Sequence, residues 1–269
     1  RVTLEQTIIQ QIQNRTLQIH QTMHFDYRHE VLSVDGLGNA EVRMIYKAVH
    51  VKQEGIGGAY EYDSQNSAGE IPVEAQGWGA LIGTELTVHI SSKGDILLIQ
   101  GLDQMFNQIV KKFKSPTGAQ LAALKQIYST KNMTGAIGQL VGPYPRSPVE
   151  IGDIWSMNTE TLQNFPMVTD NYYKVIGRKD GRVSIAVSSN IYSPVHAEPV
   201  QMGSLNLLYS ISGHGSGSIL MGERTGLVLR EKLTREFSGH VKVEDLQRSS
   251  SAIWPISVKT SMVREIKEG

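Results

Sequence analysis

Cysteine is absent from the 269 residues, so the chain has no disulfide, no thiolate nucleophile and no cysteine ligand for zinc or an iron–sulfur cluster. A surplus of one charge is missing too, because 26 Lys and Arg residues balance 26 Asp and Glu residues. A nucleic-acid-binding protein needs a basic surplus to neutralise phosphates, so we expect no nucleic-acid partner. No stretch reaches the roughly 18 apolar residues of a membrane-spanning helix, so we expect no membrane span.

The first hundred residues have the alternating pattern of antiparallel strands. From Leu17 to Val31 the odd positions are mostly apolar and the even positions polar, as in a strand with one buried face. A strand from Leu17 to Val34 would span about 55 Å at roughly 3.3 Å per residue. Strands of that length bend or coil, which favours a curved sheet, partly or fully closed, over a flat sandwich.

The pattern changes at residue 101. Over 101–148 apolar residues recur three and four positions apart, which predicts two or three helices, and three prolines end this segment. Alternation then resumes over 149–269, and its turns resemble those of residues 1–100. This indicates either an internal repeat or the general likeness of one β-meander to another. The predicted fold is mainly β with a helical insert: two similar antiparallel β-meander halves, over 1–100 and 149–269, forming curved half-barrel-like sheets joined by the helical connector.

Several turns and strand ends resemble those of one family of bacterial exported proteins. The matching segments are residues 35–44, residues 81–94, the run from Pro148 to Trp155, and Gly215–Ser218 followed by Thr225-Gly226-Leu227. That family, a domain of unknown function, occurs in Bacteroidetes and Planctomycetes and often carries a lipoprotein-type leader. The resemblance covers nearly the whole chain. It implies export and a β-rich fold, and it offers no catalytic residues to carry over.

The resemblance therefore predicts an exported protein, either periplasmic or membrane-anchored on the outer side. A chain without thiols avoids wrong disulfides in an oxidising space, although it suits the cytosol equally well. The sequence starts at Arg1 rather than methionine, which is compatible with a leader or a lipid anchor upstream.

Residues 212–218, Ser-Gly-His-Gly-Ser-Gly-Ser, are the strongest candidate for chemistry. A nucleophile elbow needs glycine two positions before and after its serine, between a strand and a helix. His214 stands two positions before Ser216, so this segment fails the test and we expect no catalytic residue. Small residues also let another backbone approach closely, which is the simpler, structural interpretation. We keep His214 and Ser216 as candidates for contact with a ligand or partner.

Histidine spacing and tryptophan placement complete the search for sites. His20 and His24 lie about 13 Å apart along one strand face, too far to share a metal ion, so we expect no metal site. No phosphate-binding or dinucleotide glycine motif is complete, so we expect no cofactor. Trp78 stands between two glycines, which favours an exposed ring. It is the third candidate for contact with a ligand or partner.

The leading hypothesis is a non-enzymatic exported protein that binds other proteins or itself, as an accessory or assembly (scaffold) component. Net charge near zero removes long-range repulsion, and an unclosed sheet leaves edges that can pair with a partner. The alternative is a carrier of an apolar small molecule or lipid, held in the half-barrel and covered by the helices. A hydrolase that uses His214 with loop carboxylates is a third hypothesis.

Overall fold

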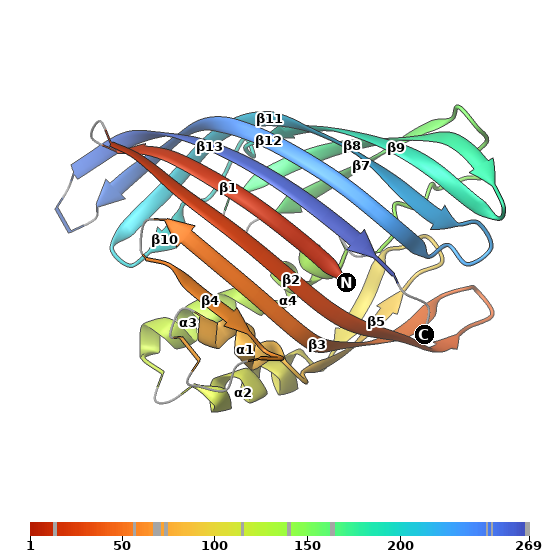
Figure 1. Ribbon diagram of the computed structural model, residues 1–269, viewed down its shortest axis with the longest axis horizontal. Coiled ribbons are helices and arrows are strands. Elements are labelled where there is room, and N and C mark those ends of the chain that lie inside the picture. Colours follow the sequence, from red (N-terminus) through yellow and green to blue (C-terminus); the bar gives the residue numbers. More distant parts are fainter. Residues whose placement is uncertain are drawn as a thin grey trace.

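The fold is known from a computed structural model, which describes the chain except residues 13–14, 56–57, 67–70, 73–74, 114–115, 139–140, 162–164, 246, 249 and 267–269. Within the described residues, the strands form one antiparallel sheet of 13 strands that arches over a group of helices (Figure 1). Both β-rich segments belong to this one sheet, because the first strand pairs with the second on one side and with the last on the other.

Eleven strands pair in a single path, and two short strands lie beside it. In pairing order the path is β6 (Ile96–Gln100), β5 (Glu85–Ile90), β3 (Ala40–Gly55), β2 (Arg15–Val34), β1 (Val2–Ile12), β13 (Ser250–Glu265), β12 (Val228–Asp245), β11 (Leu205–Gly222), β9 (Arg182–Tyr192), β8 (Met167–Lys179) and β7 (Ile154–Thr161). The two others are β4 (Tyr60–Asp63), which pairs with β3, and β10 (Val200–Met202), which pairs with β11.

The sheet curves because its long strands are irregular. In β2 the register shifts between Asp26 and Tyr27 and again near Val31, and β8 shifts between Val175 and Gly177. Such irregularities bend a strand and increase its twist. The path ends at β6 and β7 without closing into a barrel. This confirms the predicted fold class, a mainly β chain with a helical insert and a curved, half-barrel-like sheet.

The helices are α1 (Gln76–Leu81), α2 (Leu102–Lys112), α3 (Gly118–Ile127) and α4 (Thr130–Gly138). The last three lie in the segment whose spacing predicts helices, and α1 falls where the sequence pattern indicated no helix. Helix α4 packs against both β6 and β7, so it bridges the two edge strands of the open sheet. None of the described helices combines the length and the apolar character needed to cross a membrane.

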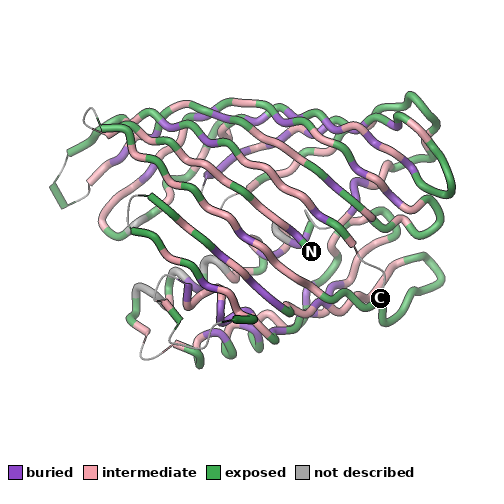
Figure 2. The backbone as a smooth tube through the Cα atoms, viewed as in Figure 1, coloured by how far each residue is buried: buried purple, intermediate pink, exposed green. Residues whose placement is uncertain are grey.

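The helices define two faces of the sheet. Met105 and Ile109 of α2 are buried and belong to one cluster with Leu86 and Val88 of β5. We call the face of the sheet that turns toward these helices the inner face, and the opposite one the outer face. Along the strands, buried positions alternate with half-buried and exposed ones (Figure 2), as expected for a sheet with one covered face.

Substitution of Ile109 tests whether α2 packs on the sheet. Its side chain has no solvent-exposed surface. Replacement by alanine leaves a cavity, so Ile109→Ala is expected to lower the free energy of unfolding by about 2–5 kcal/mol in urea denaturation. The neighbouring Gln108 is exposed, and Gln108→Ala is the control, with an expected change below about 0.5 kcal/mol. Equal effects of the two substitutions would contradict the packing of α2 on the sheet.

Candidate functional site

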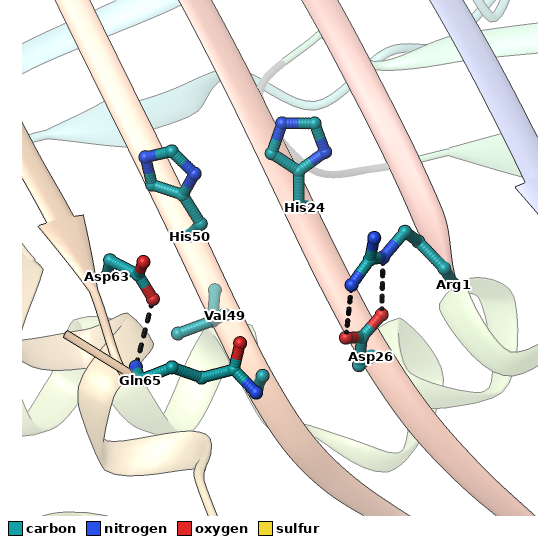
Figure 3. Close-up of a pocket in the computed structure, with 8 residues that line it drawn as sticks. Arg1, His24, Asp26, Val49, His50, Asp63 and Gln65 are labelled. Atoms are coloured by element: carbon teal, nitrogen blue, oxygen red, sulfur yellow. Dashed lines mark hydrogen bonds and ion pairs between the residues drawn. The ribbon is translucent and has the colours of Figure 1, made fainter.

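A shallow pocket opens on the outer face of β2 and β3 (Figure 3). His24 and Asp26 of β2 point outward because Phe25 between them packs on the inner side, against Trp78 of α1. The pocket has a volume of about 260 Å³, and its lining consists of Arg1, His24, Asp26, Ala48, Val49, His50, Asp63 and Gln65.

The polar groups of this pocket bind one another. Arg1 donates two hydrogen bonds to the carboxylate of Asp26, Nε to Oδ1 at 2.9 Å and Nη2 to Oδ2 at 2.8 Å. The rings of His24 and His50 stack with their centroids 5.5 Å apart, and His50 Nε2 lies 2.9 Å from Glu61 Oε1 (Figure 3 shows the two rings). Because Arg1 and Asp26 already pair with each other, the pocket offers little to a charged ligand.

No set of three or more histidine, aspartate or glutamate side chains in the described part of the chain is arranged to hold a metal ion. His24 and His50 are in register on β2 and β3, and their stacked rings form a contact between these neighbouring strands.

The pKa of His24 makes stability depend on pH. Burial lowers this pKa, and the positive charges of His50 and Arg1 lower it further against the opposing effect of Glu5 and Asp26. The unfolded chain then binds a proton more readily than the folded one, so stability falls as the pH drops below the usual histidine pKa of about 6.5.

His24→Gln is therefore expected to reduce the loss of stability between about pH 7.5 and about pH 5.5, measured by urea denaturation at each pH. His240 is exposed on β12, and His240→Gln is the control. An unchanged pH dependence in His24→Gln would contradict this interpretation.

The structure corrects the prediction that Trp78 is exposed. The residue lies on α1, its side chain is half-buried, and its ring packs 5.6 Å from that of Phe25 on the inner face. The flanking glycines do not expose the ring, because the helix turns it onto the sheet. Gly79 itself faces Tyr62, whose hydroxyl would lie 2.9 Å from an added Cβ.

His214 and Ser216 are exposed on the outer face of β11. His214 lies opposite Glu236 of β12, and that carboxylate pairs with Lys259 at 2.6 Å. Trp78 lies on the inner side, so the structure does not bring the three predicted contact residues together in one site.

The glycines of the same segment face inward and have a structural role. A Cβ on Gly213 or on Gly217 would stand 2.1 Å from a backbone oxygen of β12. These positions therefore let β11 and β12 approach closely, as the simpler interpretation of the segment held.

The sequence analysis missed a row of seven polar side chains and one glycine across the inner face. Eight strands, which follow one another in space as β3, β2, β1, β13, β12, β11, β9 and β8, each contribute one position to this row, because the positions are in register from strand to strand. The positions are Gln53, Gln21, Gln6, Thr260, Arg235, Gly215, Ser189 and Asn171, and we call them the polar row. Gln21 Nε2 donates to Gln53 Oε1 at 3.3 Å, and Ser189 Oγ donates to Asn171 Oδ1 at 2.7 Å.

Apolar positions flank the polar row on both sides. On one side Leu4, Met262 and Leu233 lie in register across β1, β13 and β12, and all three remain half-buried. On the other side Ile8 is half-buried, while Val258 and Phe237 are buried. Most of the buried apolar residues that the structure describes fall into five clusters, some of them bridged by half-buried side chains such as Trp78 and Tyr209, whereas a compact domain usually has one contiguous core. Apolar surface on the middle strands of the inner face is therefore only partly covered.

A buried ion pair lies on the same face. Glu231 of β12 and Arg264 of β13 are in register, with Oε2 and Nη2 2.8 Å apart and both side chains 7% exposed. Burial raises the pKa of Glu231, and the positive charges of Arg264 and Arg235 oppose that rise.

The model of one protein family matches residues 37–228, which is more than half of the chain and includes the helical segment with parts of both β-rich segments. The chain belongs to the DUF6263 family of unknown function. This agrees with the resemblance in the sequence to a family of unknown function. The bacterial phyla and the export that the resemblance implies stay predictions.

No curated protein is significantly similar to the chain. Among solved structures the chain is similar to one titled "Lipid-protein interactions in lipovitellin", with 9% sequence identity and a TM-score of 0.47. The match covers 100% of the present chain and 25% of the lipovitellin chain, so the present chain spans about a quarter of that length. A likeness this distant says nothing about what the present chain binds.

Proposed function

We propose that the protein carries an apolar small molecule or lipid on the inner face of its sheet. The observation that supports this most is the partial exposure of Leu4, Met262 and Leu233 on a face that curves over the helices. Covering such side chains with a hydrocarbon removes apolar surface from water, which contributes about 25 cal/mol per Å². A sheet whose concave side were filled by its own core would leave these residues buried.

The protein-binding hypothesis has less support. It rests on free sheet edges, yet α4 packs against both edge strands, β6 and β7. A covered edge is a poor template for pairing with a partner strand. Covered edges thus favour the carrier hypothesis over the protein-binding one.

The proposed activity is binding without catalysis. We also propose that the protein works outside the cytoplasm, in the periplasm or anchored on the outer side of a membrane, where an apolar molecule needs a carrier to cross water.

A neutral fluorescent probe, N-phenyl-1-naphthylamine, tests the carrier function on the purified chain. Saturable fluorescence enhancement is expected, and a long-chain alcohol is expected to displace the probe. Met262→Gln puts a polar side chain among the apolar positions beside the polar row. It is expected to weaken binding about tenfold, because fully covering a methionine side chain contributes about 1.5–3 kcal/mol and Met262 is already half-buried without a ligand.

The matched control is Ser257→Gln, on the same strand but exposed on the outer face, which is expected to bind as the parent does. Circular dichroism of both variants establishes that they fold. Absence of saturable probe binding to the parent protein would refute the carrier function.

A further inference from the structure

We propose that Arg235 binds the anionic headgroup of an amphiphile whose hydrocarbon chain lies along the apolar positions beside the polar row. This inference rests on the proposed function, since it names the ligand class for the same face. The class is a hydrocarbon chain that ends in a carboxylate or a phosphate ester.

Arg235 lies in the middle of the inner face, where the charge of Glu231 acts on it without forming an ion pair. Its guanidinium makes no hydrogen bond and no ion pair with any residue that the structure describes. The nearby carboxylate of Glu231 is committed to Arg264 at 2.8 Å. A guanidinium that is partly withdrawn from water and unpaired costs free energy, and an anion that enters beside it would offset this cost.

Burial supports this placement. Arg235 is half-buried. Burial lowers the pKa of its guanidinium, although Glu231 and the hydroxyl of Tyr173 act to raise it. Protein therefore surrounds the guanidinium on several sides, as expected for a charged group on the concave side of a curved sheet.

The neighbours of Arg235 let its stem pack closely on β11 and supply hydrogen-bond donors. Gly215 faces it across the β11–β12 pair, and a Cβ there would stand 3.1 Å from Arg235 Cγ and 3.3 Å from Ser189 Cβ. On the other side Thr260 and then Gln6 continue the polar row, and neither side chain has a hydrogen bond within the described part of the chain. A guanidinium fork with a hydroxyl and an amide beside it suits the oxygens of a carboxylate or phosphate.

The surroundings of this polar group decide the ligand class. Leu233 and Phe237 stand two residues before and after Arg235, on the same face of β12. Met262 and Val258 repeat the pattern on β13. Phe237 and Val258 are already buried, whereas Leu233 and Met262 are half-buried. A small anion without a hydrocarbon chain would leave the exposed parts of Leu233 and Met262 in water, and a neutral lipid would leave the guanidinium without an ion pair. An anionic amphiphile satisfies both.

The test compares ligands with one chain length and different headgroups, by isothermal titration calorimetry on delipidated protein. Dodecanoate and dodecyl phosphate are expected to bind about tenfold more tightly than dodecanol, or better. Arg235→Gln is expected to lose that advantage for both anions while its affinity for dodecanol stays within about twofold of the parent's. The matched control is Lys232→Gln, which removes a charge from the exposed outer face of the same strand and is expected to change none of the three affinities.

The outcomes separate this inference from the proposed function. If the parent protein binds dodecanol and both anions equally well, the role of Arg235 is refuted and the carrier function stands. If none of the three ligands binds, the carrier function is refuted as well. The comparison of headgroups on the parent protein needs no variant, so it decides the matter even if Arg235→Gln does not fold. A preference for only one anion tells a carboxylate site from a phosphate site and supports the inference.

Discussion

Glu231→Met is expected to lower the free energy of unfolding by about 3–5 kcal/mol, because it removes the carboxylate that pairs with the buried Arg264. The two side chains face each other at 2.8 Å across β12 and β13, and each is only 7% exposed. The double variant with Arg264→Met as well is expected to recover most of the loss, since apolar side chains of similar volume can replace a buried ion pair at little cost. Urea denaturation of the parent, both single variants and the double variant completes the thermodynamic cycle.

The same two strands provide a matched control. Arg230 and Glu265 also pair in register, with Nε and Oε1 3.0 Å apart, but on the outer face with exposures of 52% and 47%. Glu265→Gln is expected to change stability by less than about 1 kcal/mol, because water and salt screen an exposed pair. If Glu231→Met costs no more than Glu265→Gln, the buried pair does not have the role described here.

Gly213→Ala is expected to destabilise the protein by about 3 kcal/mol or more. The added Cβ would stand 2.1 Å from the carbonyl oxygen of Glu236 and 2.5 Å from Cα of Phe237. Both atoms belong to the backbone of β12, so no side-chain rotation relieves the contacts and the two strands must move apart. Thermal and urea denaturation measure the loss.

Gly177 supplies the control for this substitution. It also lies in a long strand, β8, but nothing stands within 4 Å of the position of an added Cβ. Gly177→Ala is expected to change stability by no more than about 0.5 kcal/mol. Similar losses for the two variants would contradict close approach of β12 as the reason for the effect at Gly213.

Much of the fold was predictable because strands and helices leave local periods in the sequence. The alternation from Leu17 onward predicts β2, and the spacing over 101–148 predicts the group of α2, α3 and α4. The length of β2 also predicts curvature, and the structure shows it. The orientation of His214 and Ser216 follows from the same alternation, since Gly213 and Gly215 take the inward positions between them.

The position of Trp78 could not be predicted from the local sequence pattern. Its flanking glycines favoured exposure, but a helix of only six residues turns the ring onto Phe25 of β2. The two residues stand far apart in the sequence, so no local period contains their contact. Packing of α1 on the sheet decides it.

Each residue of the polar row is visible in the sequence only as a single interruption of an apolar strand face, and the row itself could not be predicted from these interruptions. Gln6 stands between Leu4 and Ile8 on the inner face, and Arg235 stands between Leu233 and Phe237. Each interrupts the apolar face of its own strand, and Gln21, Thr260 and Asn171 do the same elsewhere. By itself the sequence determined the strands, their inner faces and these single interruptions, because a period of two is a local property of the chain. Only the tertiary structure aligned the interruptions into one row, because strand register depends on pairing between residues as distant as β1 and β13.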